Sequence, residues 1–101
     1  AGPPAREASW AGGGIVSPLY PWRYPDAVTA LADGATTAYA QLARALRHET
    51  GLDPEYAPCG LLMLDAADAD DAMAWARRHR RRVQRHGRDG ALALQPGLAG
   101  D

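Results

Sequence analysis

The sequence predicts a small α/β unit, and three observations support this. Apolar residues recur at intervals of three or four over about residues 25–50 and 68–86, which is typical of amphipathic helices. Two short apolar runs, about 15–19 and 59–64, have the length and composition of strands. A glycine- and proline-rich stretch over residues 1–24 favours loop with short extended pieces. The 101 residues leave room for one small domain.

The helix predicted over 25–50 has a recognisable start, stop and apolar face. Pro25 suits a first helical turn, where its missing N–H costs nothing, and Gly51 suits a left-handed terminating position. Gly34 in the interior costs about 1 kcal/mol relative to Ala, so this helix depends on packing. The residues of its apolar stripe are Val28, Leu31, Ala35, Tyr39, Leu42 and Leu46.

The strand predicted over 59–64 is followed by the helix predicted over 68–86. Aspartates gather in the first turn of that helix and arginines in its last two turns. This order complements the helix dipole, at about 0.3 to 1 kcal/mol for each well-placed charge. Gly87 is expected to end the helix, and residues 91–101 are expected to form an irregular tail.

Charge and cysteine usage exclude several classes of function. The formal net charge is -1, so no overall field attracts the chain to nucleic acid or to anionic lipid. No apolar run approaches the roughly 20 residues that span a bilayer, and no membrane partner is expected. Cys59 is the single cysteine, which excludes an internal disulfide and a thiolate zinc cage. A lone cysteine agrees with a reducing compartment, so a cytoplasmic location is expected.

The acidic and histidine clusters predict no metal site. The aspartates near residue 68 lack the glycine and the glutamate that a calcium loop requires, so we interpret them as helix-capping and dipole residues. His79 and His86 would lie about 10.5 Å apart along a helix, too far to share one ion. We expect neither a metal ligand nor a catalytic side chain in this chain.

Three consecutive glycines, residues 12–14, are the most informative feature. Glycine lets the main chain approach a ligand closely and present its N–H groups to an anion or an aromatic ring. A flexible linker is the alternative, since the run lacks the spacing of the known phosphate-binding fingerprints. The aromatic surroundings, Trp10 and residues 18–24, argue against a solvated linker.

Residues 8–22 (ASWAGGGIVSPLYPW), a long helix ending in Glu49-Thr50-Gly51, and residues 60–64 (GLLML) carry a family resemblance. In this order they resemble the FAD-dependent amino-acid oxidases of the D-amino-acid oxidase group, most closely the bacterial glycine oxidase type. The resemblance implies part of an FAD-binding Rossmann-type domain over 1–24 and the helix-strand-helix start of an antiparallel substrate domain over 25–101. The Gly-x-Gly-x-x-Gly turn and the substrate-binding arginine of such enzymes are missing, which implies an internal fragment.

The resemblance also assigns cofactor contacts residue by residue. Ala8 and Ser9 are expected against the phosphate or ribityl part of FAD, and Gly13, Gly14 and Ile15 along the ribityl chain and the isoalloxazine ring. Family members often carry alanine at the positions of Gly12 and Gly13. No catalytic side chain is implied, because FAD itself accepts the hydride.

The function implied for the whole protein is oxidation of glycine, or of another small amine or D-amino acid, to the imine with release of peroxide. A place in thiamine biosynthesis is a further expectation, as is an oligomer or the missing remainder of the chain as partner. The 101 residues alone are expected to be inactive. Two alternatives stay open: an interaction module whose arginine-rich helix binds nucleic acid or an acidic partner, and a structural remnant. Nucleic acid is disfavoured because no aromatic residues are interleaved with the arginines.

Overall fold

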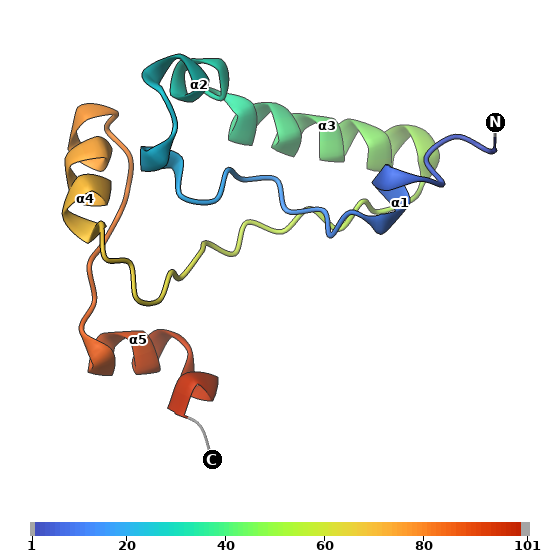
Figure 1. Cartoon of the computed structure of the whole chain (residues 1–101). Helices are drawn as coiled ribbons and strands as arrows, with labels where there is room; N and C mark the ends of the chain where they lie inside the picture. The colour runs from blue at the N-terminus through green and yellow to red at the C-terminus, as the bar shows by residue number, and fades with distance from the viewer. Residues whose placement is uncertain (1, 100–101) are drawn as a thin grey trace.

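The computed structural model describes residues 2–99, and within them the chain forms helices and no strand (Figure 1). The α/β class predicted from the sequence is therefore wrong. The elements in chain order are α1 (Ala8–Ala11), the 3-10 turn η1 (Pro21–Arg23), α2 (Asp26–Leu31), α3 (Ala35–Thr50), α4 (Ala69–Arg78), α5 (Arg88–Leu94) and the 3-10 turn η2 (Pro96–Ala99).

The two predicted strands, 15–19 and 59–64, lack the hydrogen bonds that define a strand. Within residues 2–99, no backbone hydrogen bond joins either run to another segment. An apolar run becomes a strand only when a neighbouring strand completes its ladder. These runs therefore stay irregular, and the thiol of Cys59 in the second one is exposed.

The helix predicted over 25–50 is two helices, because Gly34 adopts a left-handed backbone conformation between them. Gly34 has φ 75°, in the left-handed region, and directly precedes α3. A residue in that conformation interrupts a right-handed helix, and glycine adopts it without a steric penalty. The predicted ending at Gly51 is confirmed: its φ is 72° and its N–H donates to the Arg47 carbonyl oxygen at 2.9 Å.

The helix predicted over 68–86 is shorter than expected, since α4 ends at Arg78. Arg80 adopts φ 53°, which stops a right-handed helix, and the chain is non-helical from there to Gly87. Gly87 does not terminate α4 but lies before α5, in an extended conformation. The tail expected to be irregular is helical over residues 91–94 and 96–99, and residues 100–101 lie outside the described range.

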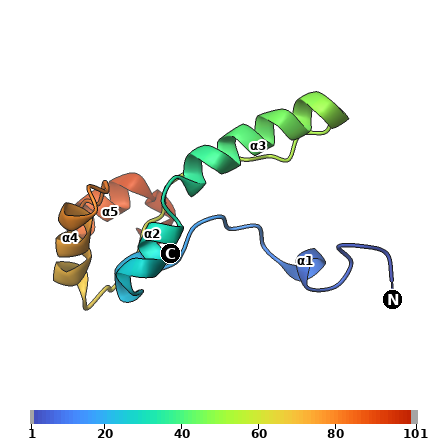
Figure 2. The same ribbon diagram turned by 90° about the horizontal axis from the view of Figure 1, so that it is seen from above.

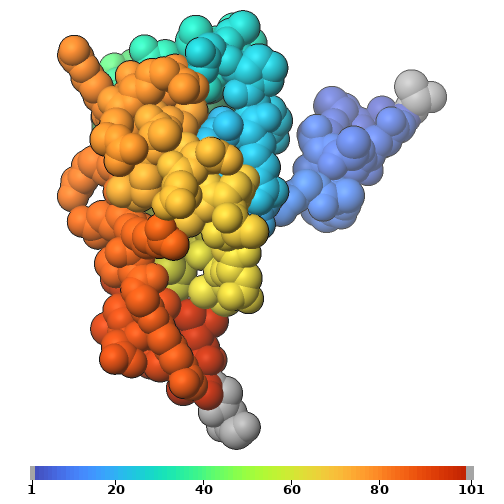
Figure 3. Space-filling model, turned by 60° about the vertical axis from the view of Figure 1, so that its left-hand side comes forward, coloured from blue at the N-terminus to red at the C-terminus, as the bar shows by residue number. Residues whose placement is uncertain are grey.

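The fold is open, with little interior. Its Cα radius of gyration is 17.1 Å, against about 13 Å for a compact domain of 100 residues. Its accessible surface is 8737 Å², against about 5,500 Å² for a compact monomer of 10.7 kDa. Figure 3 shows the N-terminal segment projecting from the body of the molecule. The buried apolar residues of the described part all belong to α4: Ala72, Trp75 and Ala76.

Candidate functional site

The residues predicted to contact the flavin lie in α1 and in the segment that follows it. Ala8 and Ser9 are in α1, whereas Gly13, Gly14 and Ile15 lie in the non-helical chain beyond it. All five are exposed, and the Ile15 side chain is 72% exposed. Viewed from above, this part of the chain stands clear of α3 (Figure 2). The structure therefore places these residues in sequence order along one open segment.

The glycine run is open on the side where side chains would point. Among residues 2–99, a Cβ atom added to Gly13 or Gly14 would meet no atom within 4 Å beyond those of the two adjoining residues. Gly14 has φ +74°, a conformation that L side chains rarely adopt. A larger side chain would therefore fit at position 13 or 14 without a steric clash. At position 14, however, the left-handed backbone conformation favours glycine.

The main chain of residues 12–16 has N–H groups that are available as hydrogen-bond donors. Within residues 2–99, the N–H groups of residues 12–16 make no backbone hydrogen bond. Free N–H groups beside unshielded glycines are the groups that receive phosphate oxygens or the polar edge of a heteroaromatic ring. Residues 12–15 thus offer the N–H donors and the open access that the ribityl and ring portions of a flavin require.

A second cluster of polar side chains joins η1 and α2 to α4, and the sequence analysis missed it. We call it the α4 cluster; its members are Trp22, Arg23, Asp26, Thr29, Asp68, Trp75, Arg78 and His79. Its first half centres on the Asp68 carboxylate, which accepts from Arg23 Nε at 2.7 Å, from Arg23 Nη2 at 3.0 Å and from Trp22 Nε1 at 2.8 Å. These donors, Arg23 first, hold the pKa of Asp68 well below its usual range.

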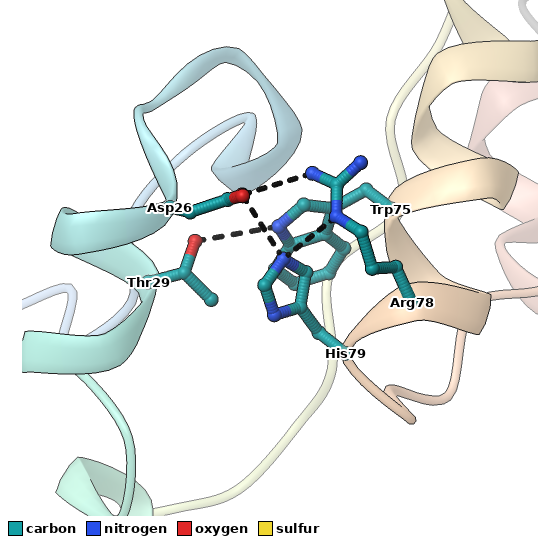
Figure 4. A network of polar contacts seen from close by, with 5 residues as sticks. All are labelled: Asp26, Thr29, Trp75, Arg78 and His79. Atoms are coloured by element: carbon teal, nitrogen blue, oxygen red, sulfur yellow. Dashed lines mark hydrogen bonds and ion pairs between the residues drawn. The ribbon is translucent and has the colours of Figure 1, made fainter.

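The second half of the α4 cluster centres on Asp26 and Trp75 (Figure 4). One Asp26 carboxylate oxygen accepts from Arg78 Nη2 at 2.9 Å and lies 3.3 Å from His79 Nε2. The hydrogen bond from Arg78 lowers the pKa of Asp26. The Trp75 indole N–H donates to Thr29 Oγ1 at 3.4 Å. These contacts span at least 46 residues of sequence, so a local pattern carries no signal for them.

An open groove of about 470 Å³ runs along the α4 cluster. Arg23 pairs with Asp68, and Arg78 pairs with Asp26. Pairs of this kind join two chain segments, and Asp71 adds a further carboxylate to the wall of the groove. The residues that line the groove are Trp22, Arg23, Asp68, Asp71, Ala74, Trp75 and Arg78.

The acidic residues around α4 confirm one part of the sequence prediction and contradict the other: Asp70 and Asp71 lie in the first turn, as the helix dipole favours, but the predicted capping is absent. Asp68 is the residue before α4, but its side chain makes no capping hydrogen bond to the helix and binds Arg23 instead. Asp70 pairs with Arg85 at 2.9 Å, and Asp33 pairs with Arg81 at 2.7 Å. Over residues 2–99 there is no group of three or more His, Cys, Asp or Glu side chains that could hold a metal ion.

Comparison with known proteins decides the family. Residues 1–101, the whole chain, match the family described as FAD dependent oxidoreductase (DAO). The chain belongs to that family. The chain is 54% identical over 97 residues to the glycine oxidase of Pseudomonas aeruginosa. This match covers 96% of the chain and 27% of the relative. The chain is 58% identical over 76 residues to the glycine oxidase of Pseudomonas putida, covering 75% of the chain and 21% of that relative.

The chain therefore spans about a quarter of the length of the curated relatives it matches. The family resemblance predicted from the sequence is confirmed, and the cofactor of this oxidoreductase family is FAD. The 97 matched residues necessarily include the glycine segment, because only four positions of the chain fall outside them. No solved structure matches the chain. No helix within residues 2–99 is long and apolar enough to cross a membrane.

Proposed function

We propose that this chain is the flavin-contacting part and the beginning of the substrate domain of an FAD-dependent amino-acid oxidase. Residues 1–24 form the flavin-facing segment, and residues 25–101 begin the substrate domain. The whole protein oxidises glycine, or another small amine or D-amino acid, to the imine and releases peroxide. The observation that carries the proposal is the left-handed, unshielded Gly14 in a segment matched to a relative named glycine oxidase.

Each residue of the flavin-facing segment has its own part in this proposal. Ala8 and Ser9 approach the phosphate or ribityl portion, while Gly13 and Gly14 direct main-chain N–H groups along the ribityl chain and the ring. Ile15, now 72% exposed, excludes water where it lies against the ring. When bound, FAD accepts the hydride from the α carbon of the substrate and passes the electrons to oxygen.

The proposal also includes a cellular location and a metabolic role for the whole protein. The single cysteine of the chain supports a reducing compartment, and we place the whole protein in the cytoplasm. The names of the relatives support a small amino acid as the substrate. A supply of imine to thiamine biosynthesis follows from the family resemblance, and feeding that pathway with the purified whole enzyme tests it.

A chimera tests the flavin-facing segment directly. In the glycine oxidase of P. aeruginosa, the matched 97 residues are replaced by those of this chain. We expect a yellow protein that releases peroxide from glycine, whereas the isolated 101-residue chain releases none. In the chimera, Gly14→Ala forces an L side chain into the left-handed region, so the Kd for FAD rises about 5- to 30-fold.

Gly60→Ala in the same chimera is the matched control. Gly60 has φ +76° and free space around it, as Gly14 does, but it lies outside the flavin-facing segment, so this substitution is expected to leave FAD binding close to that of the unmodified chimera. A colourless chimera, or equal FAD affinities for the Gly14→Ala and Gly60→Ala variants, would contradict the proposed role of the segment.

A further inference from the structure

One face of α3 is apolar and bare. Tyr39 is 45% exposed, Leu42 51% and Leu46 40%, and their spacing places all three on one side of the helix. We call these three side chains the α3 stripe. Leu31, at the end of the preceding α2, is 87% exposed. The remaining faces of α3 carry polar side chains, including Thr37, Gln41, Arg44 and His48.

The neighbouring flank of α3 is covered by the chain itself. After Gly51 the chain turns back, and the Tyr56 hydroxyl donates to the Thr36 carbonyl oxygen at 3.4 Å. Ala40 and Ala43, near that flank, are half-buried. The return segment thus contacts α3 through Tyr56 beside the α3 stripe, whose three large side chains stay about half exposed.

Two occupants of the α3 stripe are possible, a second copy of this chain or the rest of a longer polypeptide, and the second fits both the exposed surface of the whole chain and the length of the relative. The 8737 Å² of this chain exceeds the surface of a compact monomer of its mass by about 3,200 Å². A standard interface covers about 800 Å² of each partner, so one second copy would account for about a quarter of the excess. The relative from P. aeruginosa has nearly three quarters of its length outside the match, enough chain to cover the rest.

We propose that the α3 stripe is an intramolecular docking surface for the remaining three quarters of the flavoprotein polypeptide. This inference rests on the proposed function. The occupant presents an aliphatic face to Leu42 and Leu46, and leaves the Tyr39 hydroxyl at the edge of the contact, where it reaches a polar partner. In the whole protein α3 is thus an interior helix on one side and a surface helix on the other.

The test compares Leu42→Asp with Gln41→Asp, in the chimera described above and in the isolated chain. Both substitutions add one negative charge at adjacent exposed positions of α3, but only Leu42 belongs to the stripe. In the chimera, Leu42→Asp is expected to lower the melting temperature by at least about 5 °C more than Gln41→Asp, because it buries a charge. In the isolated chain, the two variants are expected to give the same helical circular dichroism and the same monomeric sedimentation.

Two results would overturn the docking surface. Equal melting temperatures of the two chimera variants would place the stripe in solvent in the whole protein. An isolated chain that sediments as a dimer and is split by Leu42→Asp would assign the face to a second copy. If the Leu42→Asp chimera does not fold, Leu42→Ala against Gln41→Ala gives the same comparison at a smaller difference in melting temperature.

The FAD content of the unmodified chimera keeps the two proposals separate. If the unmodified chimera binds FAD and is active, but its Leu42→Asp and Gln41→Asp variants have equal melting temperatures, the docking surface is contradicted and the proposed function is not. A chimera that folds without FAD, and that Leu42→Asp nevertheless destabilises, contradicts the proposed function and supports the docking surface.

Discussion

Around α4, side chains from residues 22–29 and 68–79 meet in hydrogen bonds of 2.7 to 3.4 Å and enclose Trp75. Around Gly14, by contrast, an added Cβ would meet no described atom within 4 Å beyond those of the adjoining residues, and Ile15 beside it is largely in solvent. Both regions combine apolar and polar groups. The α4 cluster finds its partners within the described residues, whereas the glycine segment makes no such contacts there and meets FAD only in the function proposed above.

Loss of the Trp75 ring is the largest expected effect. Trp75 is 7% exposed at the centre of the α4 cluster, and Trp75→Ala is expected to cost about 3 to 5 kcal/mol. That is most of the stability available to a chain of this size, so the near-ultraviolet circular dichroism should collapse. Trp10→Ala, at a side chain that is 67% exposed, is the control and should leave the signal of the cluster unchanged. A retained signal in the Trp75 variant would place the stabilising core elsewhere.

Acidification should separate η1 from α4 at an unusually low pH. The pKa values of Asp68 and Asp26 are lowered by their arginine partners, so the stability they add is present above the ordinary carboxyl pKa. It is lost only as the pH falls through the lowered values. The indole N–H resonance of Trp22 should therefore stay constant from pH 7 to below pH 4 and move at lower pH.

Asp68→Asn should move the same Trp22 resonance at neutral pH, because the pair with Arg23 is gone. Asp71→Asn, at another residue that lines the groove, is the control and should leave the resonance in place. A Trp22 resonance that titrates at the ordinary pKa of an aspartate would show that the pair does not persist in solution.

Gly34→Ala should convert the observed break into the helix that the sequence pattern predicts. The left-handed conformation at φ 75° costs a residue with a Cβ about 1 to 2 kcal/mol, so α2 and α3 are expected to join into one helix. Far-ultraviolet helicity should rise, while the contacts of Asp26 and Thr29 with α4 disappear from nuclear Overhauser spectra. Gly87→Ala, at an extended glycine with free space, is the control. If the contacts between α2 and α4 persist in the Gly34→Ala variant, the left-handed conformation at Gly34 is not what allows them to form.

The smallest effect is expected in the glycine segment of the isolated chain. Gly13→Ala meets no neighbouring atom and should change the stability of the α4 cluster by less than about 0.5 kcal/mol. The amides of residues 12–16, which make no backbone hydrogen bond within the described chain, should exchange at nearly the rate of an unfolded peptide. Protected amides in this segment would reveal a partner inside the chain.

Local signals predicted the parts of the fold that depend on local chemistry. Gly51 ends α3 in the left-handed conformation, and α4 carries Asp70 and Asp71 in its first turn and Arg77 and Arg78 in its last, in the order that the helix dipole favours. Such features involve residues within a few positions of one another, so a single sequence contains them.

The remaining features depend on residues that are distant in sequence, on strand partners that the described residues do not supply, or on a ligand. The Arg81 side chain that follows α4 pairs with Asp33, 48 residues earlier, and no spacing rule anticipates that contact. Residues 15–19 and 59–64 have strand composition but no neighbour to pair with among the described residues. The flavin contacts at Ala8, Ser9, Gly13, Gly14 and Ile15 stay predictions, because they involve FAD, which is not part of the polypeptide.

The exposed thiol of Cys59 gives this molecule a built-in reporter. It is the sole cysteine of the chain and lies on the irregular stretch between α3 and α4. A maleimide nitroxide would attach there and nowhere else, without replacing any residue that packs. Paramagnetic broadening of the Trp22 and Trp75 indole signals would then measure how closely that stretch approaches the α4 cluster, and whether the distance shortens when the glycine segment acquires a ligand.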